Sequence, residues 1–267
     1  MSFALPPILN LEKLRNRCFA NIGDFAKDAK LQETPHGRYF FQDNGAKILA
    51  VAHLDTVQQR KHFHYFNLVD KDTVFCPLLD DRLGAYVILD VLPKLGCKYD
   101  ILLTENEECC QSTAKWFLPP SFDRYNWMFE FDRAGTDVAM YQYLTNKLDN
   151  LFFEKYGVCA AHGSYTDIVD LDFLEVRGFN FGCGYHDHHS LLAHFKISEL
   201  MDMLRVFLEF YNDFKNTRFK YSKKKQKKQE RRSWGNIRYE DFSEECANME
   251  RMRFENSWIK YIDEPRF

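Results

Sequence analysis

The stretch Ala52-His53-Leu54-Asp55-Thr56-Val57 indicates which kind of fold this chain adopts. It directly follows the apolar run at residues 48–51, which is typical of a strand buried on both faces. Side chains alternate along an extended strand, so His53 and Asp55 project to the same side. An imidazole placed there can hold a metal ion while the carboxylate orients its ring. A simple polar pair at a strand end has the same pattern, and the downstream sequence must decide between the two.

Strands and helices alternate along the rest of the chain. Strands are predicted at residues 38–42, 46–52, 99–104, 126–131 and 178–185, with a strand pair at 62–69 and 73–77. Helices are predicted at residues 8–30, 80–95, 112–117, 144–155 and 197–214, with a short one from residue 166. This alternation predicts an α/β fold, a three-layer sandwich with a mostly parallel mixed central sheet and helices on both faces.

The basic residues are distributed unevenly. The 267-residue chain is 45% hydrophobic and 16% aromatic, which indicates a globular protein with a sizeable core. Its net charge is −3, but residues 215–232 contain ten Lys or Arg and a single acid, Glu230, whereas the remainder has 26 basic and 38 acidic residues. We therefore predict a main domain at residues 1–216, a basic linker at 217–233 and a helical or irregular extension at 234–267.

The spacing of the cysteines and the length of the apolar runs indicate the cellular compartment of the protein. None of the eight cysteines forms a C-x-x-C pair, so neither a zinc finger nor a dithiol redox motif is predicted. No run approaches the roughly 18 apolar residues that span a bilayer, and the first residues do not resemble a signal peptide. These features predict a cytoplasmic protein with free thiols and no membrane partner.

Acids and histidines recur where the predicted strands end or pass into helices. Open α/β sheets bind their ligands at the carboxyl ends of the strands, so these side chains are expected to converge on one site. Carboxylates and imidazoles without thiolates favour Zn, Mn or Co over a structural zinc site. The residues concerned are His53, Asp55, Asp80, Asp81, Glu105, Glu107, Glu108, Asp132, His186, His188 and His189.

Several members of this set also have a simpler explanation. Asp80-Asp81 precedes an apolar helix and suits an N-cap, which needs no metal. Glu107-Glu108 suits a solvated acidic pair, yet it closely follows the apolar strand at 101–103. Adjacent like charges in that setting are costly unless something positive neutralises them. The histidine-rich run at 185–190 is the least ordinary segment, and metal binding and a purely structural role remain open for it.

The order of these residues resembles that in the co-catalytic di-zinc exopeptidases, which include leucine and glutamyl aminopeptidases, tripeptidase, aminoacylase and glutamate carboxypeptidase. The resemblance covers about residues 45–200. The spacings leave no room for the extra domains of the larger relatives, so the single-domain layout is most similar to the leucine aminopeptidases. The matching segments are His53-Leu54-Asp55, Leu79-Asp80-Asp81-Arg82-Leu83-Gly84, Glu107-Glu108, Asp132 and His189-Ser190.

The resemblance implies a set of metal ligands. His53 and Asp132 would bind one divalent ion, Glu108 and His189 would bind the other, and Asp80 would bridge both. The implied ions are zinc, with manganese or cobalt as alternatives.

The resemblance also implies roles around the ligands. Asp55 would orient the first imidazole, and Glu107 would be the general base that moves a proton from the attacking water to the leaving amine. Tyr165 and His162, beside the turn Gly163-Ser164, are candidates for contact with the substrate or the oxyanion. One departure is Ala193, where many relatives have a Glu that follows the last His-Ser.

These roles predict that residues 1–216 form a di-metal hydrolase domain. Its substrate would be the peptide or amide bond of a small peptide or an N-acyl amino acid, and its activity most like that of an aminopeptidase. The alternative is a pseudoenzyme or regulatory protein on the same fold. In that case the basic segment, with Lys223-Lys224-Lys225, would contact nucleic acid or another anionic partner, although a solvated linker is the simpler explanation. The extension at 234–267 is rich in large apolar residues and is expected to dock on the main domain or on a second copy of the chain.

Overall fold

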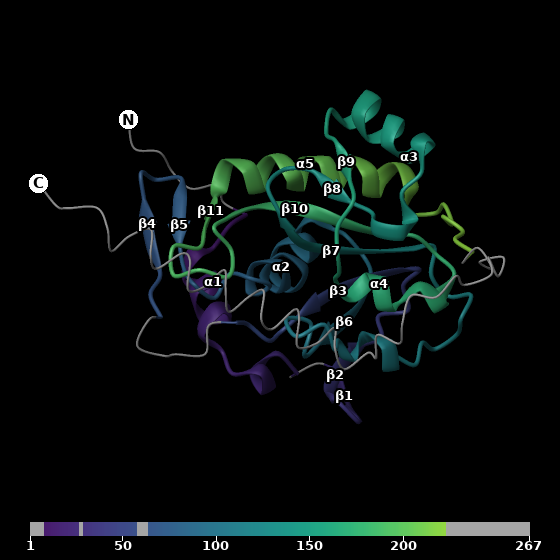
Figure 1. Cartoon of the computed structure of the whole chain (residues 1–267), viewed down its shortest axis with the longest axis horizontal. Helices are drawn as coiled ribbons and strands as arrows, with labels where there is room; N and C mark the ends of the chain where they lie inside the picture. The colour runs from purple at the N-terminus through teal and green to yellow at the C-terminus, as the bar shows by residue number, and fades with distance from the viewer. Residues whose placement is uncertain (1–7, 27–28, 58–63, 223–267) are drawn as a thin grey trace, which may run out of the picture. The chain divides into compact units, whose positions relative to one another are not determined.

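The computed structural model describes residues 8–26, 29–57 and 64–222 (Figure 1). Most of the predicted basic linker and all of the predicted extension at 234–267 lie outside these residues, as do residues 62–63 of the first hairpin strand. Within the described ranges the chain forms a mixed sheet of 11 strands, with helices packed against both of its faces. This is the α/β sandwich that the sequence predicts.

Four parallel strands form the centre of the sheet. Their order is β6 (Asp100–Thr104), β3 (Ile48–His53), β7 (Trp127–Ala134) and β10 (Gly178–His186). Every residue of β3 and β6 is buried, because helices cover both faces and only apolar runs suit such strands. Parallel strands end at the same edge of a sheet, so the polar residues that follow them meet there.

Most of the remaining strands pair antiparallel with their neighbours, so the sheet is mixed and its parallel strands lie mainly at the centre. On one side β2 pairs with β6 and β1 with β2, and on the other side β11, β5 and β4 follow β10. Parallel neighbours need a crossover of about a dozen residues or more, and the connections from β1 to β2 and from β10 to β11 are too short for one. The strands are β1 (Lys30–Thr34), β2 (Gly37–Gln42), β4 (Asn67–Val69), β5 (Thr73–Phe75), β8 (Val138–Ala139), β9 (Ala160–Ala161) and β11 (His194–Lys196).

Different helices cover the two faces. The helix α5 lies along β10 (Figure 1). The helix α2 and its helical continuation to Leu95 cover the same face of the sheet. Tyr99 joins the two, because its ring packs on that of Phe129 and its hydroxyl group donates to the carbonyl of Ile88 in the continuation. The opposite face is covered by α4, whose Ile168 amide donates to Glu130 of β7. The helices are α1 (Leu11–Phe19), α2 (Arg82–Tyr86), α3 (Asn146–Leu151), α4 (Asp167–Asp170) and α5 (Ile197–Phe214).

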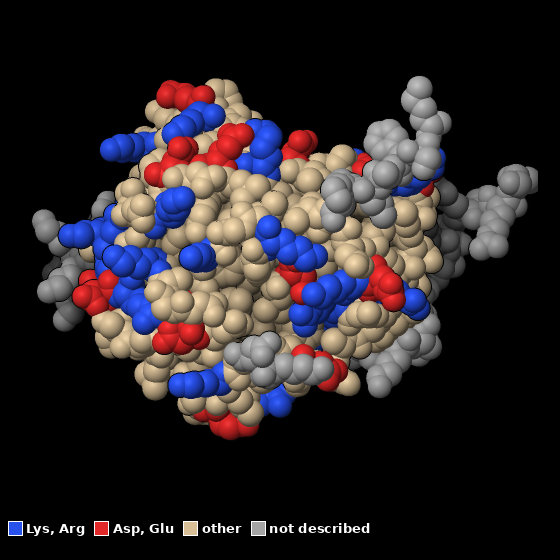
Figure 2. Space-filling model, turned by 180° about the vertical axis from the view of Figure 1, so that it is seen from behind, with Lys and Arg blue, Asp and Glu red and all other residues tan. Residues whose placement is uncertain are grey.

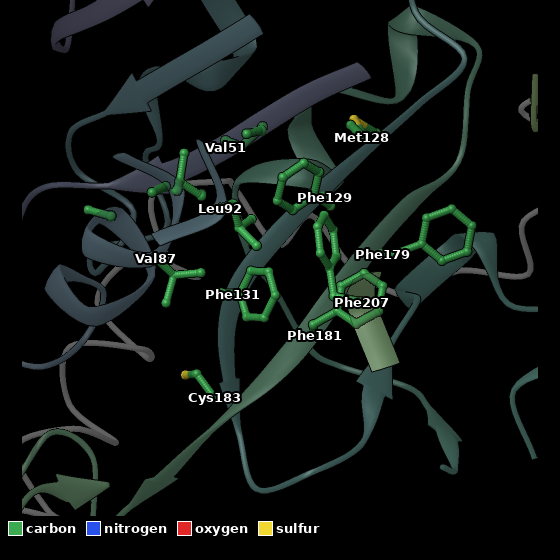
Figure 3. Packing of buried hydrophobic residues seen from close by; sticks show 14 of the residues in the cluster. Val51, Val87, Leu92, Met128, Phe129, Phe131, Phe179, Phe181, Cys183 and Phe207 are labelled. Atoms are coloured by element: carbon green, nitrogen blue, oxygen red, sulfur yellow. The ribbon is translucent and has the colours of Figure 1, made fainter. Parts of the chain in front are cut away.

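Aromatic rings fill the layer between the sheet and α5 (Figure 3). The ring centroid of Phe207 on α5 lies 4.6 Å from that of Phe129, 5.2 Å from that of Phe131 and 5.1 Å from that of Phe181. All four side chains are completely buried. Burying one such side chain contributes about 1.5–3 kcal/mol, so this layer fixes α5 and holds β7 and β10 in place.

The turn into α2 is packed without spare room. Asp81 caps the helix, because its Oδ1 accepts from the amide of Gly84 at 3.0 Å. A Cβ atom on Gly84 would lie 2.7 Å from both the Oδ2 of Asp81 and the carbonyl oxygen of Phe131. Only glycine fits this close approach, and the turn fixes Asp80, the residue immediately before the cap.

The first helix is shorter than predicted. Asn10 caps α1 by accepting from the amide of Lys13 at 2.8 Å, but the helix ends at Phe19 rather than continuing to residue 30. The Asp24 carboxylate accepts from the amide of Asn21 at 3.1 Å, a local hydrogen bond that competes with continuation of the helix. A short 3₁₀ segment, Ile22–Ala26, then leads toward β1.

The chain stays packed on this core after α5. The amide of Phe219 donates to the carbonyl of Asn126, and the amide of Tyr221 donates to the carbonyl of Glu175. How the whole chain divides into domains stays a prediction. Among the described residues, no helix is both long enough and apolar enough to span a bilayer.

Candidate active site

The carboxyl edge of the parallel strands gathers the five residues that the sequence predicts as metal ligands. Each of the five lies on a different strand or in a different loop. His53 ends β3 and is 1% exposed, Asp80 precedes α2, Glu108 lies in the loop after β6, Asp132 lies near the end of β7, and His189 follows β10.

Asp80 lies between the two histidines. Its Oδ1 is 3.3 Å from the Nε2 of His53, and its Oδ2 is 3.0 Å from the Nε2 of His189. On the first side, the Oδ1 of Asp132 is 3.7 Å from the Nε2 of His53. On the second side, the Oε2 of Glu108 is 2.9 Å from the Nε2 of His189. The five side chains thus form two halves that share one carboxylate.

The chemistry of the donor set fits divalent cations. One ligand atom each from His53, Asp80 and Glu108 lie within 4.8 Å of one another, close enough to hold one ion. The Oε1 of Glu108 is buried and has no hydrogen-bond partner among the described residues. An unpartnered buried carboxylate oxygen is costly, and a cation would satisfy it. Imidazoles and carboxylates without thiolates are the donors that zinc, manganese and cobalt accept.

The pKa shifts reflect the same crowding of negative charge. Burial alone lowers the pKa of His53, yet the facing carboxylates, Asp132 foremost, raise it well above its usual value. Burial also opposes protonation of His189, but its bonds to Asp80 and Glu108 raise its pKa to about 11. Burial, together with the charge of Asp80, raises the pKa of Asp132 well above its usual range. These carboxylates need added positive charge to be ionised together.

Asp55 ties the end of β3 to the loop after β6. Its carboxylate accepts from the amides of Glu107 at 3.3 Å and Glu108 at 3.1 Å. Its Oδ1 lies 3.6 Å from the Nδ1 of His53, and the backbone carbonyl of Asp55 makes the shorter contact to that nitrogen, 3.0 Å. Burial raises the pKa of Asp55, but the bond to His53, the charge of His53 and the backbone hydrogen bonds together outweigh it, and the net shift is downward. The carbonyl of Asp55 is therefore within hydrogen-bond distance of the imidazole, and its carboxylate lies just beyond that distance.

Glu107 lies inside the cluster without being one of the five predicted ligands. Its Oε2 is 3.8 Å from the Nε2 of His53. Burial raises its pKa well above the usual value, and the nearby charges of Asp132 and Asp167 add to this effect. A carboxylate with a raised pKa takes up a proton more readily, which is what proton transfer near neutral pH requires.

The remaining predicted positions lie around this cluster. The hydroxyl group of Tyr165 donates to Asp170 at 2.7 Å and accepts from the amide of Ser112 at 3.2 Å, and His162 is exposed. Contact of either residue with a substrate stays a prediction. Ala193 is 3% exposed and its carbonyl accepts from the amide of Cys76, so a longer side chain there would have to enter packed space.

Two histidines of the histidine-rich run have other neighbours. His186 pairs with Glu199 of α5 at 2.8 Å, and its ring stacks on that of His194. The ring of His188 lies edge-on to that of His189, with centroids 4.8 Å apart. His186 therefore joins β10 to α5 instead of completing the cluster.

The structure adds supporting residues that the sequence reasoning missed. The hydroxyl group of Thr166 lies 2.8 Å from Glu130 and 3.3 Å from Asp132. The side chain of Asn180 on β10 binds the backbone of Asp132 twice. Its Oδ1 accepts from the amide of Asp132 at 2.9 Å, and its Nδ2 donates to the carbonyl of Asp132 at 3.1 Å. Asp167 is also buried, and its Oδ2 accepts from the hydroxyl group of Thr104 at 2.6 Å. Glu130 could have been noticed, because it is an acid inside the otherwise apolar run Trp127–Phe131.

Comparisons with known proteins agree with the fold. No protein-family model and no curated protein matches the sequence. Aminopeptidase PepT from Bacillus cereus superposes with a TM-score of 0.52 at 11% identity, over 75% of this chain and 98% of that one. A tripeptidase from Staphylococcus aureus gives 0.49 at 9% identity, over 74% and 90% of the chains. An aminopeptidase from Desulfurococcus kamchatkensis gives 0.48 at 12%, over 78% and 91%.

At these identities the similarity concerns the fold alone. The fold is similar to that of aminopeptidase PepT, which is the kind of fold that the order of the sequence motifs predicts.

Proposed function

We propose that the chain is a metal-dependent hydrolase. It cleaves the peptide or amide bond of a small peptide or an N-acyl amino acid, most closely in the manner of an aminopeptidase. The observation that carries this proposal is the position of Asp80, whose two oxygens face His53 on one side and His189 on the other. A half-buried carboxylate shared by two imidazoles, each with a second carboxylate, suits two adjacent divalent ions.

The ligand assignment follows the two halves of the cluster. His53 and Asp132 would hold one ion, Glu108 and His189 the other, and Asp80 both. Zinc suits these donors best, with manganese or cobalt as alternatives. Two such ions would polarise the scissile carbonyl and make water easier to ionise.

Glu107 acts as the general base. Its side chain is buried beside His53, and its raised pKa suits it to take the proton of the attacking water. It then passes this proton to the nitrogen of the leaving amine, so the carboxylate is regenerated and no net proton is consumed. Asp55 keeps His53 in orientation and holds the loop of Glu107 and Glu108 by accepting from both amides.

The proposal is tested on the purified full chain in two steps. Metal content is measured by mass spectrometry after dialysis against zinc, manganese or cobalt. The loaded protein is then screened against amino-acid anilides, dipeptides and N-acyl amino acids. Two bound ions per chain together with turnover of one of these classes are expected.

The Glu107→Gln variant is the matched control for the screen, because it keeps the shape of the side chain and removes the base. Activity that is equal in the two proteins would contradict the assignment of Glu107 as the base. Two bound ions without turnover of any class would favour the alternative of a binding or regulatory protein.

A further inference from the structure

A second concave surface lies at the amino edge of the parallel strands, opposite the candidate active site. It encloses about 430 Å³ between the start of β3, the turn after the helical continuation of α2, and the last turns of α5. Three lysines line it, and each comes from a different segment. Lys47 directly precedes β3, Lys98 precedes β6, and Lys215 follows α5.

No acidic side chain lines this surface. Among the described residues, Lys47, Lys98 and Lys215 form no ion pair. The acids of the same stretch of α5 are engaged elsewhere, since Glu209 pairs with Arg205 and Asp213 with Lys155. Within the described ranges, the ammonium group of Lys215 contacts the Oδ1 of Asn212 at 3.5 Å and the ring of Tyr211, so no carboxylate neutralises these three charges.

The end of α5 would ordinarily disfavour an anion, because free carbonyl groups make a helix C-terminus negative. Here two of these carbonyls are occupied. The indole of Trp127 donates to the carbonyl of Phe214 at 3.0 Å, and Asn126 donates to the carbonyl of Lys215 at 3.1 Å. The usual penalty for a bound anion is thereby reduced.

Apolar residues line the surface beside the lysines, among them Ile48, Leu208 and Tyr211. Charges beside apolar walls are less well screened by water than charges on an open surface, so each lysine attracts an anion more strongly there. In the view from behind, Lys and Arg side chains gather on the left, the side on which the described chain ends (Figure 2).

We infer that this surface binds a small molecule carrying one or more phosphate groups, held by the ammonium groups of Lys47, Lys98 and Lys215. Three lysines converging from separate segments suit a compact group with several negative oxygens better than a single carboxylate. The enclosed volume accommodates a phosphorylated metabolite. Because the surface lies at the opposite edge of the sheet from the five ligand-type residues, this inference is independent of the proposed hydrolase activity.

The test uses the full chain, stripped of metal with a chelator and dialysed, so that phosphate cannot bind through ions at the carboxyl edge. Inorganic pyrophosphate is titrated in a calorimeter at low ionic strength. We expect saturable binding of one pyrophosphate per chain. The triple variant Lys47→Gln, Lys98→Gln, Lys215→Gln should bind at least about tenfold more weakly, because charge-assisted hydrogen bonds are lost.

A matched control removes three exposed lysines elsewhere, through Lys30→Gln, Lys71→Gln and Lys147→Gln. It loses the same net charge, and its affinity should change by less than about twofold, as expected for remote exposed charges. Circular dichroism and the melting temperature verify that both variants fold. Equal weakening in the two variants, or no saturable binding to the parent chain, would overturn the inference. A short single-stranded oligonucleotide that binds parent and triple variant equally, and more tightly than pyrophosphate, would also overturn it in favour of a polyanion site elsewhere.

Discussion

Two buried acids at opposite ends of β6 show how differently this protein treats a carboxylate. Asp100 begins the strand and is fully satisfied. Its Oδ1 accepts from the amides of Asn44 and Ala46 at 2.8 and 3.0 Å, while Arg124 and Tyr125 lie 3.0 and 3.1 Å from its Oδ2. Glu108, in the loop beyond the other end, has one oxygen near His189 and the other without a partner.

The difference distinguishes a structural acid from a functional one. The donors around Asp100 come from its own chain, so its charge stabilises the fold without outside help. The carboxyl edge instead gathers five carboxylates around two histidines, counted among the described residues: Asp55, Asp80, Glu107, Glu108 and Asp132. Bound cations would offset the repulsion between these carboxylates, as expected if the cluster is a metal site.

The largest expected effect is at the residue shared by the two halves. Asp80→Ala removes the one carboxylate that faces both histidines, so both ions and all turnover should be lost. Metal content and activity are measured on the same preparation. Asp187→Asn is the control, because it removes an exposed acid from the loop that carries His189. Retention of two ions by Asp80→Ala would contradict the shared-ligand assignment.

A smaller effect is expected for the base. Glu107→Gln should keep both ions and lose turnover by about a hundredfold or more, the usual contribution of general acid–base catalysis. Single-turnover measurements with saturating substrate separate this loss from weaker binding. Near-normal turnover in the variant would remove Glu107 from the reaction.

The Glu107→Gln variant should also differ from the parent chain in its free energy of unfolding. The raised pKa of Glu107 means that the folded protein binds this proton more tightly than the unfolded chain does. The ionised group therefore costs stability as the pH rises above the unfolded pKa. Without metal, Glu107→Gln should be more stable than the parent at pH 7, and the difference should shrink as the pH is lowered. Urea unfolding at several pH values measures it, and a destabilised variant would show that Glu107 supports the fold.

A smaller effect still is expected for Asp55→Asn. The side chain keeps its size but loses the charge that faces His53 and accepts from the loop amides. Metal affinity should fall by about tenfold to a hundredfold, the range seen when an outer carboxylate is removed. Competition with a metal-sensitive dye measures it. Unchanged affinity with reduced turnover would limit the role of Asp55 to placing the loop of Glu107.

The smallest effect on activity is expected at the amino edge. Asp100→Asn removes the charge of a fully buried carboxylate while Arg124, which is partly exposed, keeps its ion pair with Asp43, so the free energy of unfolding should fall by about 1–3 kcal/mol. The metal content and the turnover of the folded fraction should stay unchanged. Loss of metal from folded protein would show that the two ends of β6 are coupled.

The central strands could be predicted from the sequence because they are continuous apolar runs bounded by turn signals. β3 and β6 are examples, buried at every residue. The strands β1 and β11 could not. β1 has the pattern Lys-Leu-Gln-Glu-Thr and is mostly exposed, and β11 spans three residues, so pairing with β2 and β5 rather than their own sequence makes them strands. Propensity alone seldom identifies such strands.

The ligand-type residues could be predicted because each directly follows or ends an apolar element, and their order resembles a known family. The supporting residues could not, since Thr166 precedes α4 and Asn180 lies on the neighbouring strand β10, so only the folded chain brings them to Asp132 on β7. The role of Tyr165 stays a prediction. Its hydroxyl group donates to Asp170 and accepts from the amide of Ser112, two contacts that the sequence did not predict.

The turn before α2 determines which sequence changes this protein can accumulate. Because the carboxylate of Asp81 and the carbonyl of Phe131 occupy the space of a Cβ at position 84, Gly84 cannot be replaced unless the cap and a strand move as well. Asp80, Asp81 and Gly84 are therefore expected to be inherited as one unit. In a distant homologue that has lost a histidine, retention of Asp-Asp-x-x-Gly would indicate that the backbone turn of the site is kept although its chemistry has been lost.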